Sequence, residues 1–170
     1  MNLNKNIVLI GMMGSGKSTI GYLLSKSINF KYEDVDKLIE KENGQKISNI
    51  FEKKGEQYFR NLEEKLTLKL LKNKKIIIAL GGGGFINKNI RKEVLSNSVS
   101  FWLNWKSSTI IQRIQKSKKR PLAINSSEND LKKMISDRSK IYSDANFKIN
   151  CENLTKNMII KQIIDIYEKN

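Results

Sequence analysis

A glycine-rich segment between an apolar run and an amphipathic helix constrains the fold of this chain more than any other feature. Residues 11–18 read Gly-Met-Met-Gly-Ser-Gly-Lys-Ser and fit the pattern G-x-x-x-x-G-K-[ST]. Residues 7–10 before it are all apolar, as in a strand buried on both faces. Apolar residues at Ile20, Leu24 and Ile28 after it recur at helical spacing. The agreement of strand, loop and helix predicts a phosphate-binding loop rather than a turn with an incidental lysine.

The residue types in this loop suit a nucleotide triphosphate. Glycines let backbone N–H groups approach phosphates closely, and the helix N-terminus adds a partial positive charge there. We expect Lys17 to reach the β- and γ-phosphates, Ser18 to offer its hydroxyl to Mg²⁺, and Thr19 to bond the α-phosphate. The nucleotide-binding residues predicted in this segment are Gly14, Ser15, Gly16, Lys17, Ser18 and Thr19.

Short strand-like runs alternate with amphipathic helices along the rest of the chain. This alternation is typical of an α/β fold in which helices connect the strands of a parallel sheet. No repeat or linker divides the chain, so residues 1–170 are expected to form one domain. Strands are predicted at 7–10, 31–33, 75–80, 99–103 and 147–150. Helices are predicted from residue 17 and at 36–42, 47–54, 56–72, 89–95, 108–116, 130–142 and 156–168.

Composition narrows the chemistry and the compartment. The chain has no histidine, so a general base must be a carboxylate, Lys, Tyr, Cys or water. Its single cysteine, Cys151, excludes an intrachain disulfide and a thiolate metal cluster, which favours the cytoplasm. The net charge of +15 suits nucleic acid, a polyanion such as ATP, or a lysine-rich surface. No nucleic-acid-binding motif favours the first, and no apolar run approaches the roughly 20 residues that span a membrane.

Two aspartates follow the second predicted strand. Asp34 and Asp36 are two residues apart, so on a strand they face the same side. Both are expected to point into the crevice beyond the carboxyl ends of the strands, where open α/β sheets bind ligands. Asp34 would hold Mg²⁺ through a water, and Asp36 would accept a proton from a substrate hydroxyl. The alternative is a helix N-cap with a neighbouring surface acid.

Two arginines are candidates for binding an anionic acceptor. Arg60 has Glu63 and Glu64 at i+3 and i+4, which either form surface ion pairs or orient the guanidinium toward an anion. Arg138 continues the apolar stripe of its helix three residues after Ile135. An arginine on an inward face needs a partner or a ligand, unless it snorkels at the helix end.

Two further segments complete the predicted site. The run Gly81–Gly84 follows the most apolar strand and removes side chains where the backbone must approach something closely. Residues 117–128 form a basic, polar stretch that contains Arg120, with Arg113 seven residues earlier. A mobile loop of this kind folds over a triphosphate, excludes water and stabilises developing charge.

Together these motifs resemble the shikimate kinase family over nearly the whole chain, from Ile7 to about Asn150. The motifs occur in the order Gly11–Thr19, Asp34-Val35-Asp36, Phe59-Arg60-Asn61-Leu62-Glu63, Gly81-Gly82-Gly83, Arg120-Pro121-Leu122, and Arg138 followed by Tyr142. The resemblance implies a nucleoside-monophosphate-kinase-like, three-layer α/β/α fold. Its five-stranded parallel sheet would have the order 2-3-1-4-5, with a substrate-binding region near 34–62 and a lid near 114–127.

The resemblance also implies an activity. The family transfers the γ-phosphate of ATP to the 3-hydroxyl of shikimate, on the route to chorismate and aromatic amino acids, and is commonly monomeric. Carried over by position, Asp36, Arg60 and Gly82 contact shikimate and Arg138 holds its carboxylate. Arg120 is the lid arginine on the ATP phosphates, Arg113 resembles the arginine that stacks on adenine, and Ser18 and Asp34 serve Mg²⁺. The catalytic residues implied are Lys17, Asp36 and Arg120, and the substrate-binding residues are Asp36, Arg60, Gly81, Gly82, Gly83 and Arg138.

Other interpretations stay open at this stage. Residues 149–153 depart from the family pattern, which leaves the adenine contacts there undefined. A gluconate- or adenylate-kinase-like enzyme would keep the phosphate loop and lid but should lack the aspartate, arginine and triple-glycine set. A P-loop nucleic-acid-binding regulator is the alternative from another class, motivated by the charge. A shikimate-kinase-like domain without activity is disfavoured because every expected catalytic position is filled.

Overall fold

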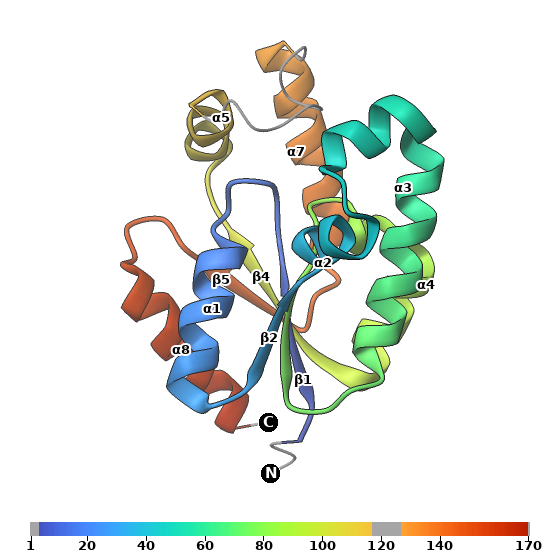
Figure 1. The fold of residues 1–170 in the computed structure, drawn as a ribbon. Coiled ribbons are helices and arrows are strands. Elements are labelled where there is room, and N and C mark those ends of the chain that lie inside the picture. The colour runs from blue at the N-terminus through green and yellow to red at the C-terminus, as the bar shows by residue number, and fades with distance from the viewer. Residues whose placement is uncertain (1–3, 117–126, 170) are drawn as a thin grey trace.

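The structure is a computed structural model that describes residues 4–116 and 127–169 (Figure 1). The first half of the chain contains β1 (Asn6–Ile10), α1 (Lys17–Ile28), β2 (Lys31–Asp34), α2 (Val35–Asn43), α3 (Ile47–Leu71) and β3 (Ile76–Ala79). The second half contains η1 (Gly84–Ile86), α4 (Lys88–Asn97), β4 (Ser98–Asn104), α5 (Ser107–Gln115), α7 (Glu128–Tyr142), β5 (Phe147–Asn150) and α8 (Lys156–Glu168).

The five strands form one parallel sheet in the order β2-β3-β1-β4-β5. This confirms the predicted order. Strand β1 lies at the centre, where Val8 is in register with Ile78 of β3 on one side and Ser100 of β4 on the other. The chain adds β3 and β2 on one side of β1 and β4 and β5 on the other. The loop after β1 therefore begins where the strand order reverses, which is where open α/β sheets bind ligands.

Both faces of the sheet are buried, which explains why the central strands are continuously apolar. Successive side chains of β1 alternate between the faces. Ile7 and Leu9 pack in a core with residues of α1 and α8, whereas Val8 and Ile10 pack with residues of α2, α3, α4 and α7. Figure 1 shows α1 and α8 on one side of the sheet and α3 and α4 on the other, which is the predicted three-layer arrangement.

The structure changes two of the predicted helices and adds one short element. The helical pieces predicted on either side of Gly55 form one element, α3, with a break at Gly55, whose φ of 79° is left-handed and favours glycine. Helix α7 begins at Glu128 rather than Asp130, because Ser127 is the N-cap and Asp130 is the third helical residue that completes a capping box. The 3₁₀ turn η1 at the end of the glycine run was not predicted.

Among the described residues, no helix combines the length and the apolar character needed to cross a bilayer. Most of the predicted lid, including Arg120, lies outside the described residues.

Candidate active site

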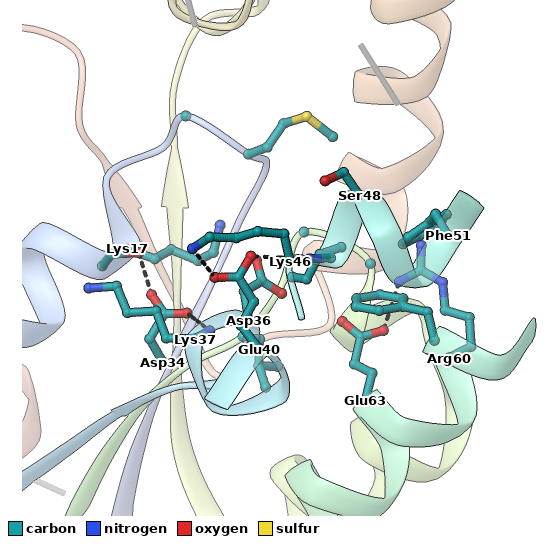
Figure 2. A pocket seen from close by; sticks show the side chains of 18 of the residues that line it. Lys17, Asp34, Asp36, Lys37, Glu40, Lys46, Ser48, Phe51, Arg60 and Glu63 are labelled. Atoms are coloured by element: carbon teal, nitrogen blue, oxygen red, sulfur yellow. Dashed lines mark hydrogen bonds and ion pairs between the residues drawn. The ribbon is translucent and has the colours of Figure 1, made fainter. Parts of the chain in front are cut away.

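A cavity of about 920 Å³ opens at the carboxyl ends of the central strands. Figure 2 shows side chains from several separate segments pointing into it. Eleven of the residues predicted from sequence line this cavity: Gly14, Gly16, Lys17, Ser18, Thr19, Asp34, Asp36, Arg60, Gly82, Gly83 and Arg138. The sequence motifs, which are spread over 125 positions of the chain from Gly14 to Arg138, thus meet in one place.

The phosphate loop is held by its own lysine. The Lys17 ammonium donates to the Gly11 carbonyl oxygen at 2.7 Å and to the Met12 carbonyl oxygen at 2.9 Å. Lys17 is buried although it lines the cavity. Ser15 is also buried; its N–H donates to the Met12 carbonyl oxygen at 3.1 Å and its hydroxyl oxygen accepts from Lys17 Nζ at 3.4 Å, so it supports the loop and does not line the cavity. The Lys17 side chain therefore lies along the loop, close to where a phosphate would bind.

Ser18 and Asp34 lie together beside the loop. The Ser18 hydroxyl donates to Asp34 Oδ2 at 2.5 Å, and Asp34 Oδ1 accepts from the N–H of Lys37 at 3.3 Å. Asp34 therefore acts as the N-cap of α2, which confirms the cap interpretation, and it also contacts Ser18; its role toward Mg²⁺ stays a prediction. The described residues contain no group of three or more acidic, histidine or cysteine side chains that could hold a metal alone.

Asp36 reaches the cavity by a different route from the one expected. Strand β2 ends at Asp34, and Asp36 lies in the first turn of α2, so strand alternation does not place the two carboxylates together. The tight strand-to-helix connection does so instead. Burial, followed by the negative charges of Asp34 and Glu63, raises the pKa of the Asp36 carboxyl to about 6. A half-buried carboxyl with this pKa is a base at neutral pH with appreciable proton affinity.

Two acids hold the Arg60 guanidinium, and one of them differs from the prediction. Glu63 contacts it at 2.7 Å and Glu56 at 3.1 Å. Glu64, which was expected to share this role, instead accepts hydrogen bonds from Asn87 and Asn89 of the neighbouring segment at 2.7 Å each. Glu64 points away from Arg60 because it lies on the face of α3 toward α4. Glu63 is 1% exposed, and burial raises its pKa.

The glycine run allows these side chains to pack against the strand end. A Cβ at Gly81 would lie 2.6 Å from both Asp36 Oδ1 and Glu63 Oε1. A Cβ at Gly83 would collide with the Arg60 guanidinium. Any side chain at either position would displace a carboxylate or the guanidinium. Close approach therefore explains the run, as the sequence predicted, although Gly81 lies behind the acids and does not line the cavity.

Arg138 lies in the cavity, as its place on the apolar stripe of α7 predicted. Its Nη1 donates to the Gly82 carbonyl oxygen at 3.3 Å. The buried Tyr142 hydroxyl, one turn further along α7, donates to the same oxygen at 2.5 Å. The two side chains tie α7 to the glycine run and place a second guanidinium in the cavity that Asp36 and Arg60 also line.

Arg113 lies outside the cavity. Its guanidinium stacks 3.8 Å from the centre of the Trp105 ring, and its Nη1 donates to the Gly14 carbonyl oxygen at 3.2 Å. It thus contacts the outer side of the phosphate loop. Of the predicted site residues, Arg120 alone lies outside the described part of the chain.

One wall of the cavity falls within the predicted substrate-binding region 34–62, but sequence reasoning named none of its residues as site residues. Residues around the start of α3 line it, including Lys46, Ser48 and Phe51, together with Phe59 further along the helix. The Phe51 and Phe59 rings pack 4.8 Å apart. Phe59 is also buried in the core, and aromatic residues at helical spacing look the same whether they face a core or a ligand. The break at Gly55 was the only available signal that this helix changes direction.

A phosphate loop on a parallel sheet, with a carboxylate base and two guanidiniums facing it, defines a P-loop kinase that acts on a small anionic acceptor. The shikimate kinase family model matches residues 13–168. A shikimate kinase from Persephonella marina is 38% identical over 161 residues, which cover 94% of this chain and 97% of the relative.

Solved structures agree with this match. A shikimate kinase from Acinetobacter baumannii in complex with shikimate has a TM-score of 0.91 and 28% identity, covering 98% of this chain and 94% of that one. A shikimate kinase from Aquifex aeolicus has a TM-score of 0.86 and 36% identity, covering 96% of each chain. The chain belongs to the shikimate kinase family.

Proposed function

We propose that this protein transfers the γ-phosphate of ATP to the 3-hydroxyl of shikimate and releases ADP and 3-phosphoshikimate. The observation that carries the proposal is the meeting of Lys17, Asp36, Arg60 and Arg138 in one cavity. Lys17 suits a phosphate, Asp36 suits a hydroxyl proton, and the two arginines suit a carboxylate. Family membership gives the same reaction.

Some of these residues position the substrates, and others stabilise charge or accept a proton during the transfer. Lys17 leaves the loop carbonyls to contact the β- and γ-phosphates and balances the charge that moves during transfer. Arg60 and Arg138 hold the carboxylate of shikimate through charge-assisted hydrogen bonds, which fixes the ring in the cavity. Asp36 accepts the proton of the 3-hydroxyl as its oxygen attacks the γ-phosphorus, and the bond from that phosphorus to the bridging oxygen of ADP breaks.

Mg²⁺ fits the oxygen atoms beside the loop. Ser18 and Asp34 offer the hard oxygen ligands that this ion takes, and their small number suits an ion that keeps waters and phosphate oxygens as its other ligands. We propose that Ser18 binds it directly and Asp34 through a water. When bound, Mg²⁺ neutralises charge on the β- and γ-phosphates.

We extend the proposal to the domain organisation and setting of the enzyme. Residues 34–62 supply Asp36 and Arg60 and form the substrate-binding region. Residues 114–127 form the lid, from which Arg120 contacts the ATP phosphates. The protein is expected to act as a cytoplasmic monomer, and its single, buried cysteine suits a reducing compartment.

The position of the new ester tests the reaction as written. After incubation with ATP, Mg²⁺ and shikimate, phosphorus and proton NMR should show one phosphate ester, on the oxygen of carbon 3. An ester at another hydroxyl would contradict the placement of Asp36.

Replacing Arg138 should mainly weaken acceptor binding. Arg138→Ala removes a charge-assisted contact to the carboxylate, so we expect the KM for shikimate to rise by about 10- to 100-fold with a smaller change in the KM for ATP. The matched control is Lys140→Ala, which removes an exposed cation from the same helix. Steady-state kinetics with each substrate varied in turn gives both values. An unchanged KM for shikimate in Arg138→Ala would refute the role.

The two acids on Arg60 should contribute unequally. Glu63→Gln breaks a buried ion pair and frees the Arg60 guanidinium, so we expect the KM for shikimate to rise by about 10-fold. Glu56→Gln removes a carboxylate whose side chain is 58% exposed, and we expect a change of less than about twofold. Equal effects of the two substitutions would show that burial of Glu63 is not what orients Arg60.

A further inference from the structure

Trp105 connects the phosphate loop to the helix that carries Arg113. It lies between β4 and α5, and its indole N–H donates to the Ser15 carbonyl oxygen at 2.9 Å. The Arg113 guanidinium stacks on its ring at 3.8 Å and donates to the Gly14 carbonyl oxygen at 3.2 Å. Two consecutive carbonyls of the loop are therefore held from outside by one short segment of chain.

The indole contact fixes the direction of a peptide group that faces the nucleotide. In a trans peptide the C=O and the following N–H point in opposite directions. Holding the Ser15 carbonyl on the outer side of the loop therefore aims the Gly16 N–H toward the cavity, which Gly16 lines. Backbone N–H groups of such loops bind phosphate oxygens, so the orientation of this peptide bears directly on nucleotide affinity.

The segment that carries Trp105 is itself anchored. Glu152, in the turn after β5, accepts a hydrogen bond from the Lys106 N–H at 3.2 Å and from the Thr109 hydroxyl at 2.9 Å. Thr109 lies one turn before Arg113 on α5. The carboxylate thus holds both the residue after Trp105 and the helix of Arg113. These hydrogen bonds hold the segment that carries Trp105 in place, so the position of its indole relative to the loop is defined.

We propose that Trp105 is a positioning residue for nucleotide binding, which orients the Ser15–Gly16 peptide with its indole N–H and holds Arg113 beside the loop with its ring. This inference rests on the proposed function, because it concerns the nucleotide half of the same site. It assigns two separable contributions to one side chain. Substitutions that remove one or both contributions distinguish them.

Calorimetric titration with Mg·ADP measures these contributions without an acceptor. Trp105→Phe keeps an aromatic ring but loses the N–H donor, so the dissociation constant should rise about 3- to 10-fold. Trp105→Leu also removes the stacking surface, which should add a further increase of about 2- to 5-fold. The KM for shikimate should change less than about twofold in both variants, because the loop carbonyls lie away from the acceptor residues.

An Arg113→Gln background separates positioning from a general loss of stability. There Trp105→Phe should still weaken Mg·ADP binding by the same factor, whereas Trp105→Leu should be no worse than Trp105→Phe, because no guanidinium remains to be stacked. Trp102→Phe is the control for loss of an indole elsewhere, since the Trp102 ring packs against Tyr142.

Two results would overturn the inference. One is an Mg·ADP dissociation constant for Trp105→Phe within twofold of the parent value, and this conservative variant decides the question if Trp105→Leu fails to fold. The other is full additivity of Trp105→Leu with Arg113→Gln. Neither result bears on shikimate turnover, so the inference can fail while the proposed function stands. Loss of shikimate turnover in the parent protein would leave the Mg·ADP titration unaffected.

Discussion

Lys17→Met should reduce kcat by about 10²- to 10³-fold or more while the fold is retained, because it removes a cation that stabilises charge on the transferred phosphoryl group. Methionine keeps most of the apolar stem, so packing around this buried side chain changes little. The variant also loses the hydrogen bonds from Lys17 Nζ to the carbonyls of Gly11 and Met12. A small loss of thermal stability is therefore expected alongside the loss of activity.

The control for Lys17→Met is Lys26→Met on the same helix. Lys26 is exposed in the last turn of α1, and its ammonium lies 5.6 Å from the centre of the Tyr22 ring. Its replacement makes the same change in net charge and should leave kcat within about twofold. If both variants kept the parental rate, or lost it equally, the assignment of Lys17 to the phosphates would be wrong.

Asp36→Asn should have the second large effect. Asparagine is nearly isosteric but cannot accept the hydroxyl proton, so kcat should fall by about 10²- to 10⁴-fold. In the parent protein we expect the acid form of Asp36, whose pKa is about 6, to be inactive. The kcat/KM for shikimate should therefore rise with pH up to about 6 and then level off, because this ratio reports the pKa of the enzyme without bound shikimate. Glu42→Gln, on the exposed side of the same helix, should retain the parental rate and profile.

The same carboxyl should destabilise the folded protein at neutral pH. Its pKa is higher in the folded than in the unfolded chain, so the folded state binds more protons between about pH 4 and 6, and stability falls as pH rises through this window. Asp36→Asn avoids this cost and should be more stable than the parent by about 1–2 kcal/mol at pH 7.5, after allowance for partial exposure. Urea unfolding at pH 7.5 and at pH 4 measures it.

The advantage of Asp36→Asn should disappear at pH 4, where the parental carboxyl is protonated in the folded state. A variant that is inactive and also less stable than the parent at pH 7.5 would indicate that Asp36 is a structural residue. A variant that is inactive and more stable would identify a group kept for function at a cost in stability.

The parts of the fold that repeat a regular spacing could be predicted from the sequence. The strand before the phosphate loop is apolar at every position because both of its faces are covered, and this also marked it as central. The boundary at Asp130 was misjudged because an acid three residues into a helix resembles an N-cap in the sequence. Only the contact with Ser127 distinguishes the two.

Site residues could be predicted where the residue type itself requires a particular kind of neighbour. Arg138 on an apolar stripe required a polar partner, and the glycine run required a close neighbour. Which residue would be the neighbour was harder to predict from the sequence. Arg60 pairs with Glu56 and not with Glu64. Both acids are one helical turn from Arg60, so their spacing does not distinguish them, and only the position of the next helix does.

Contacts between distant segments could not be derived from spacing. The hydrogen bond from Trp105 to the phosphate loop joins residues 90 positions apart, and no periodic pattern in either segment predicts it. A tryptophan after a strand is equally compatible with a core position.

The choice of acceptor is the central claim, and one parallel assay tests it most directly. ADP release is coupled to NADH oxidation and followed with ATP and Mg²⁺ in the presence of shikimate, gluconate or AMP. The account predicts rapid, saturable turnover with shikimate alone, which stops when Mg²⁺ is chelated and is lost in Lys17→Met. Turnover with gluconate or AMP and none with shikimate would contradict it.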